Sequence, residues 1–358
     1  MSERKVGLDI LKIFAMIMVL SLHILGQGGF LSSNNSNLIA PALLLETFCI
    51  VAVNCYVLIT GYFQVDLKFK FSKILKLWVK IFFYSSAIYL ILLFLNKTQF
   101  SLVECLESFF PFFTKRYWFI NSYILLYILS PFINKFIRVL EKKEYEMLLL
   151  ILFIFFSVFS SFLPGNFSFD STGGYGIIWF IVLYLFGAYI KLYWKDNYNN
   201  NKNLYIYLLI TIGSFLVSLF IKYLSAKFNF YDFSTSLFGY NTFTVFLASI
   251  FLFLYFKNIN IKSTKIKKWV GKIVPLTLGV YVIHEQSVLR KILYFDILNL
   301  DIWWNDIYQM IVIPIFIILV FFICILIEKI TINTFQKWIF NILEKIYLKM
   351  PLKNKDIA

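Results

Sequence analysis

Three ionisable residues lie inside the first long apolar stretch of the chain. Residues 7–26 read GLDILKIFAMIMVLSLHILG, and Asp9, Lys12 and His23 are the only ionisable side chains among them. On an α-helix, Lys12 and His23 would project from nearly the same face, about 16 Å apart along the axis. Because ionisable groups are costly in lipid, they usually face a protein interior or an aqueous path. We therefore predict that this helix carries a cation near the inner boundary and a histidine, a candidate general base, near the outer one.

Glu46 is a second candidate catalytic residue. It lies about five residues from the outer end of the next apolar stretch, and His23 lies four residues from the outer end of its own. A two-helix hairpin would place the carboxylate and the imidazole at similar depths, where Glu46 could orient His23 and stabilise its charged form. A carboxylate held at the level of the lipid headgroups is the alternative interpretation.

His284 is the only other histidine and a third candidate catalytic residue. It precedes Glu285 in the late apolar stretch IVPLTLGVYVIHEQSVLRKIL, about ten residues beyond the expected inner boundary. That position is near the middle of a membrane. A buried histidine also serves as a structural hydrogen-bonding group, so both roles are open for His284.

The composition places the chain in a membrane. Its 358 residues are 60% hydrophobic and 21% aromatic, whereas soluble domains contain about 45–50% apolar residues. We predict an all-α, polytopic membrane protein, because runs long enough to cross a bilayer of about 30 Å recur along the sequence. Ten spans are expected, at about 8–26, 41–62, 75–95, 117–136, 145–163, 177–194, 204–224, 240–257, 273–293 and 308–328.

The distribution of Lys and Arg sets the expected orientation. With both termini cytoplasmic, 27 of the 34 Lys and Arg residues fall on the inner side and 7 on the outer side, as the positive-inside rule requires. This bias explains the formal net charge of +15, so no nucleic-acid partner is expected. The first apolar stretch leads to no small-residue cleavage site, and we expect it to be retained as a span.

Two regions are expected, a transmembrane domain over residues 1–330 and a cytoplasmic amphipathic helix and tail over residues 331–358. The helix would lie on the inner leaflet, because its lysines avoid one apolar face. That face comprises Phe335, Trp338, Ile339, Ile342, Leu343, Ile346 and Met350. The four cysteines, Cys49, Cys55, Cys105 and Cys324, show neither metal-ligand spacing nor a paired framework, so no metal site is predicted.

Cations and aromatic residues at two further places are candidate binding groups. Lys73, Lys76 and Lys80 follow helical spacing at the start of the third span and would form a basic stripe at the cytoplasmic mouth. Such a stripe either approaches anionic lipid or holds the phosphates of a cytoplasmic cofactor. Arg116 and Trp118, at the outer start of the fourth span, are candidate substrate-binding residues.

Four segments resemble, in order, the motifs of the acyltransferase-3 family of integral membrane acyltransferases. KVGLDILKIFAMIMVLSLH resembles its first helix, in which Arg or Lys is followed after ten residues by His, here Lys12 and His23. ITGYF resembles the Ser-Gly-Tyr/Phe end of the second helix, YWFINSYILLYILSPFIN the Trp-Phe helix, and LGVYVIH the late Tyr-x-x-His helix. The resemblance covers nearly the whole chain and includes the expected ten spans.

The sequence departs from the family pattern at single residues and in the expected absence of an additional domain. Lysine replaces the commoner arginine at Lys12 and in the Lys73 and Lys76 stretch. The replacement keeps the positive charge but loses the planar guanidinium, which can bind a phosphate through two parallel hydrogen bonds. Thr60 replaces the usual serine. No extra hydrolase-like domain follows the tenth span, so we expect the membrane portion or a partner to complete the transfer.

The resemblance implies an O-acyltransferase of the bacterial plasma membrane. It would move an acetyl group from cytoplasmic acetyl-CoA to a hydroxyl of a cell-surface or capsular polysaccharide, or of its lipid-linked precursor. Lys12, Lys73 and Lys76 would hold the phosphates of the coenzyme while its extended arm reaches toward His23. His23 would act as general base, with an acyl-histidine relay as the alternative. The glycan acceptor and membrane lipids are the expected partners, and a homodimer is compatible with the sequence.

A transporter or flippase for a lipid-linked glycan is the competing interpretation, because intramembrane acids, bases and histidines also line translocation paths. Transporters commonly contain two related halves. The second half of this chain has no counterpart of Asp9, Lys12 and His23, which counts against that class. A structural subunit of a glycan-assembly complex is a third alternative.

Overall fold

The computed structural model describes residues 4–32, 36–114, 116–162, 169, 172–195, 200–229, 234, 236–303 and 308–349. Every regular element within these ranges is a helix, which confirms the predicted all-α class. The chain divides into two compact units. Unit 1 comprises residues 1–67 and 132–274, and unit 2 comprises residues 68–131 and 275–358. The expected boundary between residues 330 and 331 stays a prediction.

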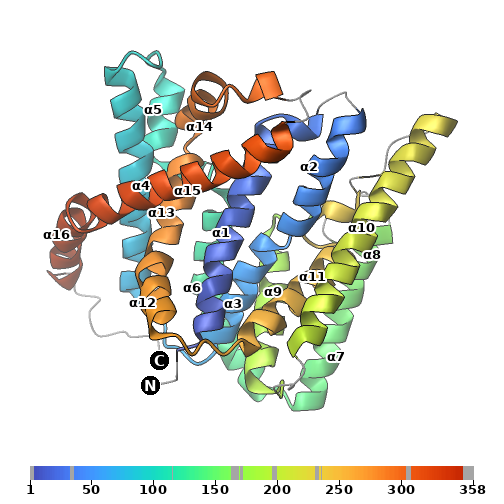
Figure 1. Ribbon diagram of the computed structural model, residues 1–358. Coiled ribbons are helices and arrows are strands. Elements are labelled where there is room, and N and C mark those ends of the chain that lie inside the picture. The colour runs from blue at the N-terminus through green and yellow to red at the C-terminus, as the bar shows by residue number, and fades with distance from the viewer. Residues whose placement is uncertain are drawn as a thin grey trace. The chain divides into compact units, whose positions relative to one another are not determined.

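Unit 1 is organised around α1 and α3. Helix α1 packs against α2, α3, α11 and α12, and α3 packs against α9 and α11 (Figure 1). Helix α7 continues through a π-helical turn, η3, into α8. The helices are α1 (Val6–Gln27), η1 (Phe30–Ser32), α2 (Ser36–Cys49), α3 (Ala52–Gln64), α7 (Lys142–Phe153), η3 (Ile154–Val158), α8 (Phe159–Phe162), α9 (Ile177–Leu192), α10 (Asn200–Phe228), η5 (Ser236–Phe238), α11 (Phe243–Asn258) and α12 (Thr264–Ile273).

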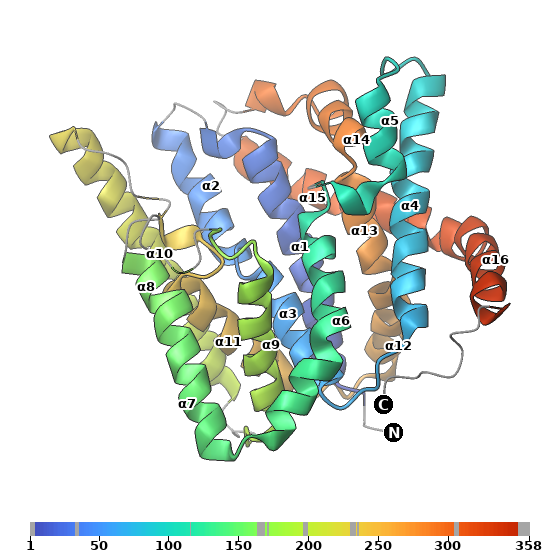
Figure 2. The ribbon, with the colours of Figure 1, turned by 180° about the vertical axis from the view of Figure 1, so that it is seen from behind.

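Unit 2 is organised around α4, which packs against α5, α13, α14 and α16. Helix α15 crosses this group obliquely (Figures 1 and 2) and packs against α13 and α16. The helices are α4 (Phe71–Phe94), α5 (Leu102–Phe109), η2 (Pro111–Phe113), α13 (Thr277–His284), α14 (Ser287–Lys291), η7 (Ile292–Ile297), η8 (Leu300–Trp303), α15 (Gln309–Ile332) and α16 (Phe335–Lys349). Two further helices, α6 (Trp118–Val139) and η6 (Val274–Leu276), each contain residues of both units.

Eight stretches of the described chain are long and apolar enough to cross a membrane, against the ten expected. They are Val6–Gln27, Ile39–Gln64, Phe71–Phe94, Trp118–Val139, Lys142–Phe162, Asn200–Phe228, Ser236–Asn258 and Ile311–Ile332. The expected sixth span corresponds to α9, a shorter apolar helix. The chain is therefore a multi-pass membrane protein, and the cytoplasmic placement of both termini stays a prediction.

The expected ninth span, residues 273–293, is not one continuous helix. Helix α13 ends at His284, Glu285 lies outside the helices, and α14 begins at Ser287. Gln286 caps α14, since its side-chain Oε1 accepts a hydrogen bond from the amide of Leu289 at 2.7 Å. The apolar sequence did not predict this break, because hydrophobicity alone does not show where a side chain replaces the backbone hydrogen bonds of a helix. Interrupted helices of this kind occur in membrane proteins where backbone groups line a site or are satisfied by neighbours.

The connection between α4 and α6, expected on the outer side, folds back along α4. The hydroxyl of Tyr89 donates to the carbonyl of Ser101 at 3.2 Å, next to the start of α5. At the other end of α5, the rings of Phe109 and Phe82 lie 6.1 Å apart. Phe82 lies about 18 Å along the helix from Phe94, where α4 ends. Helix α5 therefore runs antiparallel to α4 rather than away from it (Figure 2).

Two glycines set the close approach of α3 and α9. A Cβ at Gly187 would lie 2.3 Å from the carbonyl oxygen of Leu58, and a Cβ at Gly61 would lie 2.2 Å from that of Tyr184. Both obstacles are backbone atoms, so a side chain could be accommodated only by moving the helices apart. Small residues at such contacts allow helices to pack closely in membranes.

We expect Gly187→Ala to destabilise unit 1 by about 1–3 kcal/mol, the usual cost of overpacking a core. Thermal unfolding of the detergent-purified protein, followed by its monodisperse fraction, measures the effect. Gly213→Ala is the matched control, because a Cβ at Gly213 meets no atom within 4 Å. Equal melting temperatures for the two variants would contradict the close packing of α3 on α9.

Candidate functional site

The N-terminal end of α1 carries a compact charge cluster centred on Asp9. This carboxylate is 7% exposed and accepts hydrogen bonds from Arg4 Nε at 2.7 Å and from Lys12 Nζ at 3.0 Å. Two cations thus share one anion, which leaves the cluster with a formal charge of +1. The ammonium of Lys12 also lies 5.3 Å from the centre of the Phe63 ring, a cation–π contact that limits its orientations.

Lys12 and His23 lie on the same unbroken helix, as predicted, since α1 runs from Val6 to Gln27. The Tyr56 hydroxyl of α3 donates to the Lys12 carbonyl at 2.6 Å. Toward the other end, the amide of Gly28 donates to the carbonyl of His23 at 3.3 Å, which contributes to ending the helix. The helix therefore holds the Lys12 cation and the His23 imidazole on one rigid element.

Glu46 lies on α2, which packs against α1. The Oε2 atom of Glu46 is buried and forms no hydrogen bond with any described residue. An unsatisfied buried acceptor is costly, so a ligand hydroxyl or another donor would be stabilised there. The pairing of Glu46 with His23 stays a prediction.

Tyr175 supplies a hydroxyl near Glu46, just before α9. Burial raises the pKa of this hydroxyl, a hydrogen bond with Tyr240 lowers it, and the negative charge of Glu46 raises it further. The rings of Tyr175 and Tyr240 lie 4.9 Å apart. A carboxylate and two phenol side chains thus gather at this end of unit 1, a combination suited to binding polyhydroxylated molecules.

A fully buried asparagine holds this end of unit 1 together. Asn54 of α3 is 0% exposed; its amide donates to the Tyr240 carbonyl at 2.8 Å and its oxygen accepts from Trp179 Nε1 at 3.1 Å. Gly174, with φ of 86°, brings the backbone against Tyr240 where a Cβ would clash. No local sequence pattern marks Asn54, because its partners lie more than a hundred residues away along the chain.

In unit 2, His284 lies at the last position of α13 and is 0% exposed. Its Nδ1 is 2.6 Å from the Val280 carbonyl oxygen. A carbonyl only accepts hydrogen bonds, so Nδ1 carries the proton and the neutral ring has its lone pair on Nε2. This hydrogen bond gives the buried Nδ1 a partner. It also fixes the tautomer in which Nε2 is the nitrogen that can accept a proton, as a general base must.

The two residues after His284 add polar groups at the helix break. Glu285 is 5% exposed and accepts a hydrogen bond from Arg290 Nη1 at 2.6 Å. The Nε2 atom of Gln286 is buried and has no hydrogen-bond acceptor among the described residues. An unused amide donor beside an imidazole and a carboxylate could bind a carbonyl or hydroxyl oxygen.

The predicted phosphate-binding lysines of α4 face aromatic rings. Lys73 Nζ lies 5.5 Å from the centre of the Tyr127 ring, and Lys76 Nζ lies 4.9 Å from that of Phe340 in α16. Cation–π contacts leave a cation able to meet phosphate on its other side. The binding of coenzyme phosphates by these two lysines stays a prediction.

Lys80 does not belong to that basic stripe. It is 8% exposed, and its Nζ lies 2.5 Å from the Oε1 of Glu328, a carboxylate of α15 that is 0% exposed. Tyr84 donates to the other oxygen of Glu328 at 2.6 Å, and Gln336 donates to it at 2.9 Å. Helical spacing grouped Lys80 with its neighbours, because the acidic partner is distant in sequence.

Arg116 and Trp118, the predicted substrate-binding residues, follow η2. The Arg116 guanidinium pairs with Glu104 at 2.8 Å and also contacts Glu107 and Ser287. Trp118 begins α6, and its ring meets that of Phe119 edge-on at 6.0 Å. The two acidic partners show that Arg116 stabilises the folded-back segment, and a contact with substrate stays a prediction.

Comparison with known proteins identifies the family. The family model described as an acyltransferase domain, acyltransferase-3, matches residues 5–329, which contain α1, the two histidines, Glu46 and the helix break. No significant match was found among curated proteins or among solved structures. Because the family model covers nearly the whole chain, the protein belongs to the acyltransferase-3 family of membrane acyltransferases.

Proposed function

We propose that the protein is an O-acetyltransferase that moves the acetyl group of cytoplasmic acetyl-CoA to a hydroxyl of a surface or capsular polysaccharide, or of its lipid-linked precursor. The observation that carries the proposal is the family match combined with Lys12 and His23 on one continuous helix. The roughly 16 Å between these residues along the axis is comparable with the extended arm of the donor. The bacterial plasma membrane is the proposed location.

His23 is proposed as the general base, with Glu46 beside it. The imidazole takes the proton of the acceptor hydroxyl as that oxygen attacks the thioester carbonyl carbon. The tetrahedral intermediate collapses, the carbon–sulfur bond breaks, and the thiolate of coenzyme A receives the proton from the imidazolium. The Glu46 carboxylate stabilises the imidazolium between these steps. His284, with its lone pair on Nε2, is the second catalytic candidate.

The inner charge cluster suits the phosphates of the donor. Asp9 holds Arg4 and Lys12 together, and the cluster lies at the N-terminal end of α1, where the helix dipole favours anions. Lys73 and Lys76 of α4 are the other proposed phosphate ligands. Arg4 is a further candidate phosphate ligand that the sequence did not indicate, since it shares the carboxylate of Asp9 with Lys12.

We expect Lys12→Ala to raise the KM for acetyl-CoA about tenfold, the equivalent of losing one charge-assisted contact. Because Lys12 lies far from the reacting carbonyl, kcat should change much less. Initial rates in membrane vesicles with radiolabelled acetyl-CoA measure both constants. Lys12→Arg is the matched control and should remain near the wild-type KM; an unchanged KM in Lys12→Ala would contradict the assignment.

The proposed function is tested by acetyl transfer itself. Inside-out vesicles with and without the protein are given radiolabelled acetyl-CoA, and surface glycan from the corresponding cells is examined by proton NMR for O-acetyl methyl signals that vanish on mild base treatment. The proposal expects base-labile acetyl groups only where the protein is present. Identical acetylation with and without it would refute the proposal, and altered glycan export alone would favour the transporter interpretation.

A further inference from the structure

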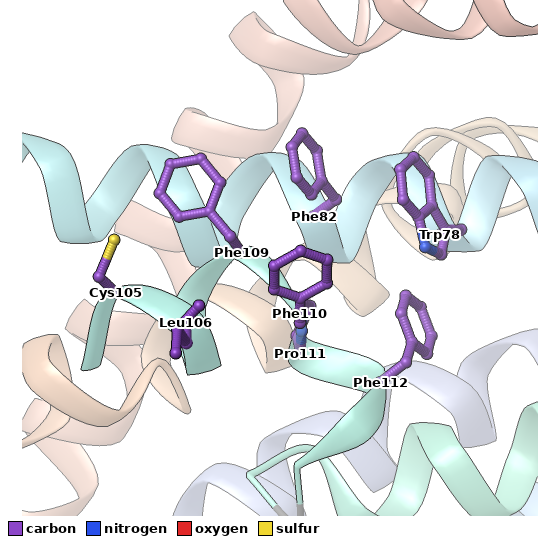
Figure 3. Close-up of a pocket in the computed structure, with 8 residues that line it drawn as sticks. All are labelled: Trp78, Phe82, Cys105, Leu106, Phe109, Phe110, Pro111 and Phe112. Carbon is purple, nitrogen blue, oxygen red and sulfur yellow. The ribbon is translucent and has the colours of Figure 1, made fainter. Parts of the chain in front are cut away.

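A pocket opens between α4 and the segment that folds back along it. Trp78 and Phe82 of α4 form one wall, with stacked rings 5.1 Å apart. Leu106, Phe109 and Phe112 contribute to the opposite side (Figure 3). The volume is about 560 Å³, and the eight lining residues are apolar apart from the thiol of Cys105. The pocket lies entirely within unit 2.

The position and lining of the pocket favour binding of a hydrocarbon chain rather than water. Its α4 wall belongs to a helix that is long and apolar enough to span a membrane, and Trp78 lies about 24 Å along that helix from its end at Phe94. Water in such a space would find no polar partners. The pocket is continuous with exposed apolar side chains, since Leu106 is 50% exposed and Phe110 54%. A hydrocarbon chain can therefore enter from the lipid phase.

The chain that follows the pocket leads to the candidate site of unit 2. η2 ends at Phe113, and Arg116 follows, held by Glu104 and Glu107 of α5. The Arg116 guanidinium also contacts Ser287, three residues after His284. Arg116 thus joins the segment that lines the pocket to the element that carries His284, so the pocket and His284 belong to neighbouring parts of unit 2.

We propose that this pocket binds the hydrocarbon tail of a lipid-linked acceptor and so presents the attached sugar for acylation. The proposal rests on the proposed function and narrows it, because the acceptor is then the lipid-linked precursor rather than finished polysaccharide. The tail supplies affinity through burial of apolar surface, and the aromatic walls restrict where the chain can lie.

Cys105 provides a direct test of occupancy. Cys49, Cys55 and Cys324 are buried, whereas Cys105 is partly exposed and lines the pocket. The protein in phosphatidylglycerol vesicles is treated with N-ethylmaleimide, with and without undecaprenyl phosphate, and alkylation of Cys105 is followed by mass spectrometry. We expect undecaprenyl phosphate to slow alkylation at least fivefold, and an equal amount of additional phosphatidylglycerol to have no effect. Equal rates with both lipids would overturn the proposal.

Substitution within the pocket gives an independent measurement. Leu106→Trp should fill the pocket and raise the KM for a lipid-linked sugar about tenfold, with an unchanged KM for a water-soluble sugar acceptor. Val103→Trp is the matched control, because Val103 lies on the same helix and is 63% exposed. Protection of Cys105 without any acetyl transfer would refute the proposed function alone. Transfer to both acceptors, unaffected by Leu106→Trp, would refute the lipid site alone.

Discussion

Replacement of His23 by glutamine is expected to reduce acetyl transfer by about 10²–10⁴-fold, the usual contribution of a general base. Glutamine retains hydrogen-bonding capacity and similar size but cannot accept the proton of the acceptor hydroxyl. The KM for acetyl-CoA should change little, because donor binding is assigned to the other end of α1. Initial rates in vesicles with radiolabelled acetyl-CoA give both constants.

The control for this variant is Phe14→Leu, a substitution on the same helix at a side chain that is 49% exposed. It should leave rate and membrane abundance unchanged. Wild-type transfer by His23→Gln at equal abundance would remove His23 from the mechanism and leave His284 as the remaining histidine candidate. His284→Gln, measured in parallel, shows whether the ring fixed by Val280 also contributes to the rate.

The same variant distinguishes the two mechanisms proposed for His23. An acyl-histidine relay would transfer label from acetyl-CoA to the protein when no acceptor is present, whereas a general base would not. Label that appears on the wild type and is absent from His23→Gln indicates the relay. Transfer without such label, under conditions in which an acyl-imidazole survives, indicates direct attack by the acceptor.

The sequence predicted those features that depend on local composition. Hydrophobic runs predicted most of the long helices, and the spacing of Lys12 and His23 correctly placed both on one helix, because α1 is uninterrupted from Val6 to Gln27. The family resemblance followed from short motifs and is confirmed by the match over residues 5–329.

The features that escaped prediction depend on contacts between distant residues or on breaks within apolar runs. Asn54 joins Tyr240 and Trp179, and no local pattern marks it. The interruption after His284 depends on the side chain of Gln286 acting as a cap. Ser101 caps the folded-back α5, since its side chain accepts a hydrogen bond from the amide of Glu104 at 3.4 Å. A cap of this kind indicates where a helix starts but not in which direction it runs.

Lys80→Met is expected to destabilise unit 2 by about 3–5 kcal/mol, the cost of leaving a buried charge without its partner. The carboxylate of Glu328 is 0% exposed, so water cannot replace the ammonium group. Its carboxyl carbon also lies only 2.5 Å from where a Cβ at Gly279 would be, which leaves little room for rearrangement. The expected result is a large loss of folded protein in the membrane and a lower melting temperature in detergent.

The double variant Lys80→Met, Glu328→Gln identifies the cause of that loss. Glutamine removes the charge but keeps an oxygen that can accept the hydrogen bond of Tyr84, so most of the lost stability should return. If instead the double variant is as unstable as Lys80→Met, the packing of the lysine chain, and not its charge, stabilises the fold. Recovery would show that the Lys80–Glu328 pair joins α4 to α15 through complementary charge, and that Lys80, unlike Lys73 and Lys76, is not available to the donor.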